Sequence, residues 1–312
     1  MSEMKQILDR NLEKQIMTYA DARAKLVELF PEIEFEDEPL PNSSGGKRIF
    51  LGIFRGRKVV VKLHRENGKA DQEAKATRKA KIMLSEKALP VPCVKYVRDN
   101  AIVLEYISGD KFEISDMKHR RLSIEYLIEM HSVRASDDLE DHYFGQALRN
   151  RIHQERLRLE QALQAAEQLD EVVSDFDCLC LRAVSAADSD SKGVISHGDY
   201  QPRNLLCTGY AVVPIDWVDF GRAHQAYDIC NLLYELPFKT VLEGTIYYAN
   251  RKFGKDVSSS QIESILREGS AIAGVIRAGS HFRQIINGSD RCFVEGALRT
   301  VRHGLELTEA RH

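Results

Sequence analysis

The spacing of apolar positions in the first sixty residues predicts a helical start followed by strands. Residues 4–29 carry apolar side chains at helical intervals, so one or two amphipathic helices are expected there. An acidic, proline-containing stretch at 31–41 interrupts this pattern. Two runs rich in β-branched and aromatic residues follow at 48–54 and 58–63. Residues 55–57, Arg-Gly-Arg, predict a tight turn between them, and the two runs are expected to form a hairpin.

The pattern then becomes helical once more before it returns to strands. Residues 69–87 are charged and helix-forming, and the two prolines of 89–92 are expected to end that helix. Residues 94–97 and 101–107 predict two further strands around an Asp-Asn turn. Residues 108–110, Ser-Gly-Asp, have the composition of a linker.

Beyond the linker the pattern is mainly helical. A long charged helix is expected at 150–173 and a flexible loop at 184–193. Two short apolar runs, 194–196 and 211–215, predict strands, and helical spacing resumes from about 226 to the end. The chain is therefore expected to be an α+β protein with a small β-rich lobe at 1–107 and a larger helical lobe at 108–312.

Composition excludes several classes of protein. The chain has 312 residues, of which 43% are hydrophobic, which is ordinary for a globular protein. A net charge of −3 disfavours a nucleic-acid partner. No apolar run is long enough for a membrane span and no signal peptide is apparent, so we expect a cytoplasmic protein without a membrane partner. The six cysteines are scattered and indicate reduced, mostly buried thiols. Monomer and homodimer remain equally open.

Polar side chains follow both short strands of the helical lobe. Asp199 and Asn204 come after the first strand, and Asp216 comes directly after the second. An acid and an amide oxygen together suit Mg²⁺, which takes oxygen ligands. A second acid, free of the metal, can accept a hydroxyl proton and orient a nucleophile. These residue types predict phosphoryl transfer.

The front lobe offers candidates for holding nucleotide phosphates. Lys62 lies on the strand 58–63, and a small-residue loop that includes Ser44 and Gly45 precedes the hairpin. Phosphoryl transfer needs such a cation and such a donor-rich loop. An acid on the following helix is expected to pair with the lysine. Glu73 is the best placed, with Asp71 and Glu66 as alternatives that the sequence leaves open.

These residues resemble one known family. The stretch H197-G-D-Y-Q-P-R-N204 is similar to the His-Gly-Asp-x-x-x-x-Asn signature of the aminoglycoside phosphotransferase and choline kinase-like superfamily, and I215-D-W217 is similar to its metal-binding Ile-Asp-Trp. Weaker matches at V59-V-V-K62, at L104-E-Y-I-S-G109 and at Asp228 occur in the same order. The resemblance implies a bilobal protein-kinase-like fold with the lobes predicted above.

The resemblance also implies roles for individual residues. Asp199 corresponds to the catalytic acid that orients the acceptor hydroxyl, and Asn204 and Asp216 correspond to the Mg²⁺ ligands. Lys62, paired with Glu73, would hold the phosphates of ATP or GTP.

The purine edge of the nucleotide would contact the backbone of Glu105, Tyr106 and Ile107. The expected partners are therefore a nucleoside triphosphate and a small-molecule hydroxyl acceptor.

Some features depart from protein kinases. Asp219 begins an Asp-Phe-Gly, but Asp216 stands at the strand end where the family motif falls, so Asp219 is expected in the turn or behind the metal site. The loop at 41–46 lacks a full G-x-G-x-x-G, and no Ala-Pro-Glu follows Asp216, which disfavours a protein substrate. Arg203 is expected either to contact the transferred phosphate or to lie on the surface. His197 is expected to support the loop rather than act as a base.

The acceptor is left open by the sequence. Residues 251–312 are rich in arginine, which disfavours a polycationic aminoglycoside, whereas the acidic cluster at 137–141 favours a cationic acceptor. A sugar, an amino alcohol, homoserine and another antibiotic hydroxyl remain candidates. Two other functions stay as alternatives: a compact atypical protein kinase and a catalytically inactive nucleotide-binding scaffold.

Overall fold

The structure is a computed structural model, and it describes residues 18–37, 40, 47–189, 193–288 and 291–309. Of the described residues 57% are helical, and the chain has the predicted α+β, protein-kinase-like fold, with a β-sheet region followed by a helical region. It forms two compact units, one of Met1–Arg78 with Pro92–Ile107 and the other of Lys79–Val91 with Ser108–His312.

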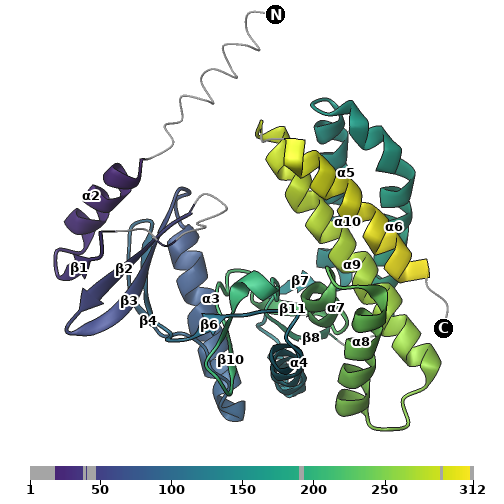
Figure 1. Cartoon of the computed structure of the whole chain (residues 1–312), viewed down its shortest axis with the longest axis horizontal. Helices are drawn as coiled ribbons and strands as arrows, with labels where there is room; N and C mark the ends of the chain where they lie inside the picture. Colours follow the sequence, from purple (N-terminus) through teal and green to yellow (C-terminus); the bar gives the residue numbers. More distant parts are fainter. Residues whose placement is uncertain (1–17, 38–39, 41–46, 190–192, 289–290, 310–312) are drawn as a thin grey trace, which may run out of the picture. The chain divides into compact units, whose positions relative to one another are not determined.

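The first unit is built on one antiparallel sheet of five strands (Figure 1). In spatial order the strands are β1 (Ile33–Phe35), β2 (Lys47–Phe54), β3 (Arg57–His64), β5 (Ala101–Glu105) and β4 (Val94–Arg98). The predicted hairpin is confirmed, because β2 and β3 pair along their whole length. Its turn holds Arg55 and Gly56 at φ values of 50° and 73°. Two successive positive φ values match the twist of the flanking strands.

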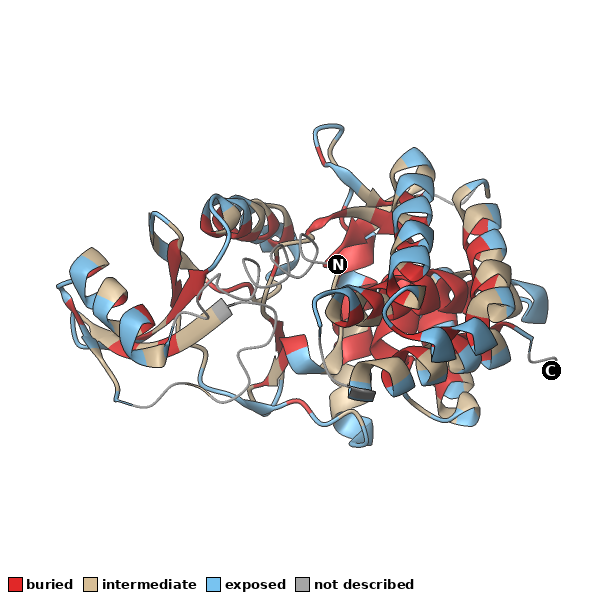
Figure 2. Cartoon of the chain, turned by 90° about the horizontal axis from the view of Figure 1, so that it is seen from above, coloured by how far each residue is buried: buried red, intermediate tan, exposed pale blue. Residues whose placement is uncertain are grey.

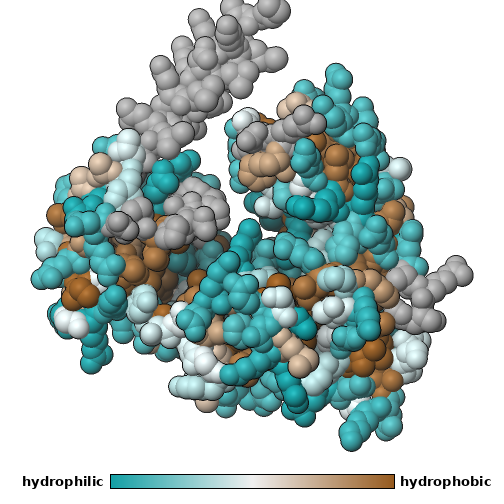
Figure 3. Space-filling model, in the orientation of Figure 1, coloured by the Kyte–Doolittle hydropathy of each residue, from teal (hydrophilic) through white to brown (hydrophobic). Residues whose placement is uncertain are grey.

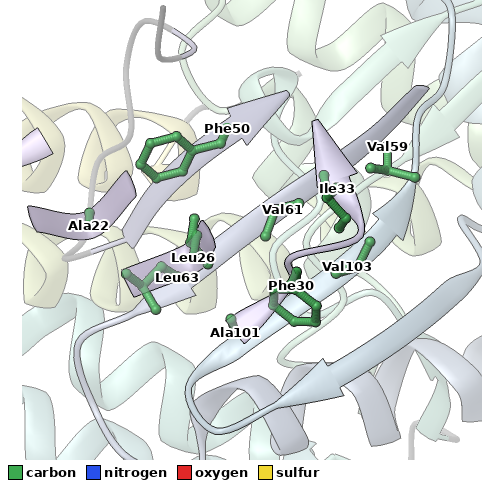
Figure 4. Packing of buried hydrophobic residues seen from close by; sticks show 10 residues of the cluster. All are labelled: Ala22, Leu26, Phe30, Ile33, Phe50, Val59, Val61, Leu63, Ala101 and Val103. Atoms are coloured by element: carbon green, nitrogen blue, oxygen red, sulfur yellow. The ribbon is translucent and has the colours of Figure 1, made fainter. Parts of the chain in front are cut away.

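Helices cover both faces of this sheet. Helix α2 (Tyr19–Leu29) begins at a capping box of Thr18 and Asp21 and buries Ala22 and Leu26 against one face. Figure 4 shows these residues with the rest of that core: Phe30, Ile33, Phe50, Val59, Val61, Leu63, Ala101 and Val103. Helix α3 (Lys69–Leu84) packs Ala70 and Ala74 on the other face, against Ile102 and Leu104.

Strand alternation on β3 decides where Lys62 points. Val61 and Leu63 belong to the core under α2, whereas their neighbour Val60 packs with the cluster of α3. Successive side chains of a strand face opposite sides. Lys62 therefore points to the side of the sheet that α3 covers. Helix α3 confirms the helix predicted for 69–87, with a 3₁₀ turn at Ser85–Lys87 as its last part.

The second unit contains two small three-stranded sheets, most of whose strands were not predicted. In one, β9 (Leu205–Cys207) lies between β10 (Val212–Pro214) and β6 (Asp110–Lys111); in the other, β11 (Gly221–His224) lies between β7 (Asp141–Tyr143) and β8 (Gly193–Ser196). The runs predicted at 194–196 and 211–215 correspond to β8 and β10. The remaining strands have two to four residues, which is too short for a recognisable period.

Helices make up the rest of the second unit: α4 (Met117–Ser132), α5 (Gly145–Leu163), α6 (Val173–Ala187), α7 (Tyr227–Leu233), α8 (Phe238–Phe253), α9 (Ser259–Ile286) and α10 (Arg291–Glu309). Helix α9 is central, since it packs against α5, α6, α7 and α10 (Figure 1). Figure 2 shows buried residues along the inward sides of these helices and exposed ones along their outer sides.

Two boundaries predicted from sequence were wrong. The helix expected at 150–173 begins at Gly145 and ends at Leu163, and a 3₁₀ stretch follows at Glu167–Val172. The loop expected at 184–193 is helical through Ala187, because Ala183 and Ala186 are buried and extend the apolar side of α6. Packing there outweighs the weak helix propensity of the serines.

The surface of the second unit is mixed in character. On the face drawn in Figure 3, hydrophilic residues prevail and hydrophobic ones show between them in smaller groups. In the described part of the chain, no helix combines the length and apolar character needed to cross a membrane.

Candidate active site

The loop after β8 holds the carboxylate of Asp199 from two sides. The Asn204 Nδ2 donates to Asp199 Oδ2 at 2.7 Å and to the Asp199 carbonyl at 2.9 Å. The Gln201 side-chain amide donates to the other carboxylate oxygen. Asp199 itself is 29% exposed. The carboxylate is therefore fixed in direction and remains open to a substrate.

Asp216 is brought to the same place by strand pairing. Strands β9 and β10 pair antiparallel, and the Ile215 N–H donates to the carbonyl of Asn204 at 2.8 Å. Asp216 follows directly, with a φ of 67°. A residue other than glycine rarely adopts this left-handed conformation outside turns and functional sites. The structure thus brings together Asp199, Asn204 and Asp216, as the sequence predicted.

Gly198 allows this loop to approach the turn after Asp216. Its φ is 82°, and a Cβ at this position would lie 2.6 Å from the Cβ of Asp219 and still closer to the Asp219 carbonyl. Only glycine fits both constraints. Asp219 lies in the turn, as predicted, and its backbone packs against Gly198.

Buried hydrogen bonds hold the loop from behind. Asp228 Oδ2 accepts from the His197 backbone N–H at 3.2 Å and lies 3.3 Å from the His131 Nε2. The His197 Nε2 lies 3.1 Å from the Ile215 carbonyl, and its Nδ1 accepts from the Asp199 N–H. Burial lowers the pKa of His197, so the ring is neutral and serves as a brace. Trp217 packs on it, with ring centroids 4.4 Å apart.

The donor set here fits a divalent cation. Burial and the negative charge of Asp199 raise the pKa of Asp219, and Asp216 adds to the effect, so negative charge gathers around this loop. Such crowding of negative charge favours a hard cation. Asn204 uses its Nδ2 on Asp199, which leaves its amide oxygen as the atom suited to a metal. Arg203 Nη2 lies 3.6 Å from Asp199 Oδ2 and is largely exposed.

In the first unit, Lys62 meets Glu73. The Lys62 Nζ is 2.5 Å from Glu73 Oε1, and both side chains are almost fully buried. Of the three acids considered from sequence, Glu73 is the one paired with the lysine. His64 also approaches the pair, with its Nε2 3.0 Å from Glu73 Oε2. Sequence reasoning missed His64, although its position two residues after Lys62 places it on the same face of β3.

The remaining predicted nucleotide contacts are placed only in part. The Glu105 backbone N–H donates to the Cys93 carbonyl at 2.9 Å, so this donor is used within the sheet. Tyr106 and Ile107 follow the end of β5. Ser44 and Gly45 lie outside the described residues.

A family-wide sequence profile described as "Phosphotransferase enzyme family" matches residues 39–255, which is more than half of the chain. The chain belongs to this phosphotransferase family. The match spans the Lys62–Glu73 pair and the whole of the loop that carries Asp199, Asn204 and Asp216. A search of curated protein sequences found no match.

Solved structures of similar fold include kinases of small alcohols and of antibiotics. An ethanolamine kinase from Plasmodium vivax is 16% identical with a TM-score of 0.69, covering 96% of this chain and 92% of that one. A choline/ethanolamine kinase family protein from Mesorhizobium loti is 16% identical with a TM-score of 0.63, covering 93% and 94%. A spectinomycin phosphotransferase in complex with ADP and spectinomycin is 10% identical with a TM-score of 0.61, covering 92% and 97%.

Proposed function

We propose that this phosphotransferase moves the γ-phosphate of ATP or GTP to a hydroxyl group of a small molecule. The observation that carries the proposal is the loop geometry: a fixed, partly exposed Asp199 beside Asn204, with Asp216 in a strained conformation at the adjoining strand end. Strain at one residue of a polar cluster is typical of functional sites.

Asp199 is the residue proposed to act on the acceptor. Its carboxylate accepts a hydrogen bond from the acceptor hydroxyl and aims that oxygen at the γ-phosphorus. The new oxygen–phosphorus bond forms as the bond between the γ-phosphorus and the bridging oxygen breaks, and the hydroxyl proton leaves through Asp199. Mg²⁺, held by Asn204 and Asp216, would neutralise charge on the phosphates. Catalysis here is chiefly positioning.

The first unit is proposed to hold the nucleotide. Lys62, kept in place by Glu73, carries the positive charge for the phosphates. Backbone groups of Glu105, Tyr106 and Ile107 are proposed for the purine. Because the Glu105 N–H is already bonded to Cys93, only its carbonyl is assigned to this role.

The loop with Ser44 and Gly45 remains the proposed cover for the phosphates. The buried Lys62–Glu73 pair supports a nucleotide site, because a buried ion pair often contributes no net stability and so favours a functional reason for its presence.

Turnover by purified protein tests the proposal. Nucleotide consumption is measured with Mg²⁺ across hydroxylated antibiotics, sugars, amino alcohols and hydroxy acids, for the wild type, for Asp199→Asn and for Asp137→Asn as a surface control. Loss of an acid–base group costs about 10²–10⁴ in rate. The Asp199 variant is expected to lose turnover on that scale while it still binds nucleotide, and the Asp137 variant to keep it. Equal turnover by the two variants would remove Asp199 from its proposed role.

A further inference from the structure

One face of α5 gathers positive charge around a buried acid. Arg151, Glu155 and Arg158 stand at i, i+4 and i+7 spacing, so they share that face. Glu155 is fully buried, and its Oε1 lies 2.6 Å from Arg151 Nε and 2.5 Å from Arg158 Nη1. The two arginines keep 30% and 26% of their side chains exposed. A single carboxylate thus faces two guanidinium groups.

Helix α9 adds a third arginine to this cluster. Helices α5 and α9 pack side by side (Figure 1), and they touch at Gly279, where a Cβ would lie 2.8 Å from the Cγ of Glu155 and overlap its carboxyl group. Arg283 follows one turn later on the same face of α9. The contact of Glu155 with Gly279 therefore places Arg283 near Arg151, and burial together with the positive charge of Arg151 lowers the pKa of Arg283.

The cluster has more positive charge than its own acid can neutralise. Arginine stays protonated in proteins, so Arg151, Arg158 and Arg283 all carry charge opposite one Glu155. Within the described residues the Arg283 side chain makes no hydrogen bond or ion pair, and Arg151 pairs with Glu155 alone. The Asp219 carboxyl is a second counter-charge close to Arg151. Three guanidinium groups therefore share two carboxyl groups, and this excess of positive charge favours an anionic partner.

This cluster adjoins the loop that carries Asp199, within the same unit. Helix α5 begins two residues after β7, and Tyr143 at the end of β7 stacks on Tyr227 with ring centroids 4.5 Å apart. The Tyr227 hydroxyl donates to the Gly198 carbonyl at 3.1 Å. The positive charge of Arg151 offsets part of the rise in the pKa of Asp219 that burial and Asp199 cause, so Arg151 lies near Asp219, whose backbone packs on Gly198. Arg151 is therefore close to the residues that pack on the loop of Asp199.

We propose that the acceptor is an anionic alcohol, a hydroxyl compound that also bears a carboxylate or a phosphate group. Its anionic group binds Arg151 and Arg283, and its hydroxyl reaches Asp199. This inference rests on the proposed function and adds the charge class of the acceptor to it. Guanidinium groups bind carboxylate and phosphate through paired hydrogen bonds, which fixes orientation as well as charge.

The same cluster rejects cationic acceptors. A quaternary ammonium or polyamine group brought to Arg151 and Arg283 would meet like charge, with Glu155 already shared between two arginines. The acidic cluster at 137–141 offers no compensation from Asp138 or Asp141, since Asp138 pairs with Lys79 and Asp141 with Arg222.

Matched acceptor pairs, in which one member carries an anionic group that the other lacks, test the proposal. Glycerol is compared with glycerol 3-phosphate, ribose with ribose 5-phosphate, and propanediol with lactate, and choline represents cationic alcohols. The first two pairs report on phosphate and the third on carboxylate. The wild type is expected to show a kcat/KM, or an affinity by calorimetry, at least about tenfold higher for an anionic member than for its neutral partner. Choline is expected to be the poorest acceptor.

Variants then assign the selectivity to the cluster. Arg283→Gln is expected to raise KM for the anionic acceptor about 10- to 100-fold, with the KM for nucleotide unchanged, and Arg283→Lys to recover part of the loss. Arg156→Gln is the control, because Arg156 lies on the same helix but pairs with Asp177 on α6. Nucleotide binding and thermal unfolding are measured in parallel, because a variant that fails to fold would lose one or both.

Two results would overturn the inference while leaving the proposed function intact: preferred turnover of neutral or cationic acceptors, or an Arg283→Gln protein with unaltered selectivity. Failure of the proposed function has a different signature, since nucleotide would then be bound but never consumed with any acceptor. In that case, calorimetry that detects no charge preference among the matched pairs would overturn the inference as well.

Discussion

Replacing Gly198 by alanine probes whether the close approach of two turns positions the catalytic loop. Gly198 has a φ of 82°, and its Cα faces the backbone of Asp219. The new methyl group would be 2.6 Å from the Asp219 Cβ and would overlap the Asp219 carbonyl oxygen. Since that neighbour is backbone, it cannot rotate away as a side chain could. The turn must move, and Asp199 moves with its neighbour Gly198.

The expected magnitude has two parts. A Cβ in the left-handed region costs roughly 1–2 kcal/mol. Overpacking against a fixed neighbour adds about 1–3 kcal/mol. The free energy of unfolding should therefore fall by about 2–5 kcal/mol, which corresponds to a melting temperature roughly 5–15 °C lower. A displacement near 1 Å at the reacting groups costs about 10²-fold in rate, so kcat should fall at least that far at temperatures where the variant is folded.

Gly209→Ala is the matched control. Gly209 has a φ of 84°, nearly that of Gly198, and among the described residues no atom lies within 4 Å of a Cβ placed there. It should show the conformational cost alone, about 1–2 kcal/mol, with normal kcat. Both variants are compared by thermal unfolding and by steady-state kinetics. Equal losses of stability and equal kcat in the two variants would refute the role given to the Gly198–Asp219 contact.

Three further outcomes follow from buried groups. Glu73→Gln leaves the buried Lys62 without its carboxylate, so the KM for nucleotide should rise about tenfold or more, and unchanged nucleotide kinetics would contradict the pairing. Burial lowers the pKa of His131 and His197 from 6.5, so the unfolded state binds more protons than the folded state in acid. The free energy of unfolding should therefore decrease as the pH falls below about 6.5, by up to roughly 1.4 kcal/mol per pH unit for each histidine. Denaturant unfolding with a constant free energy from about pH 7.5 to about pH 5.5 would contradict this. Asp228→Ala removes the hydrogen-bond acceptor of the His197 N–H and of His131. The free energy of unfolding in urea should fall by about 2–3 kcal/mol, and kcat should fall as well. Full activity would show that the hydrogen bonds of Asp228 are dispensable for catalysis.

The local parts of the fold and site were accessible from sequence because they depend on neighbours along the chain. The hairpin of β2 and β3 is set by Arg55, Gly56 and the apolar runs beside them. Asp199, Asn204 and Asp216 could be grouped because short apolar runs end just before Asp199 and Asp216. The pairing of β9 with β10, which brings Asp216 to Asn204, was not predicted. Strand alternation alone did not decide the role of Lys62. The structure shows its partner, Glu73 on the next helix, and the role stays a prediction.

The parts that were missed depend on contacts between distant segments. The strands β6 and β7 exist because β9 and β11 pair with them, and neither has a period of its own. Arg283 was only one basic residue among many in the last third of the chain. Its closeness to Arg151 follows from the contact of α5 with α9 at Gly279, and no local pattern encodes that contact. The sequence shows the spacing of Arg151, Glu155 and Arg158, but it does not show that α9 packs against them.

Transfer of label from the γ-phosphate of ATP tests the central claim most directly. Purified protein is incubated with Mg²⁺, labelled ATP and the acceptor panel, and the label is traced to inorganic phosphate, to protein or to a small organic molecule. The proposed function predicts label in a small molecule with the wild type and none above background with Asp199→Asn. Label found only in inorganic phosphate or only in protein, or transfer that persists in the Asp199→Asn protein, would contradict it.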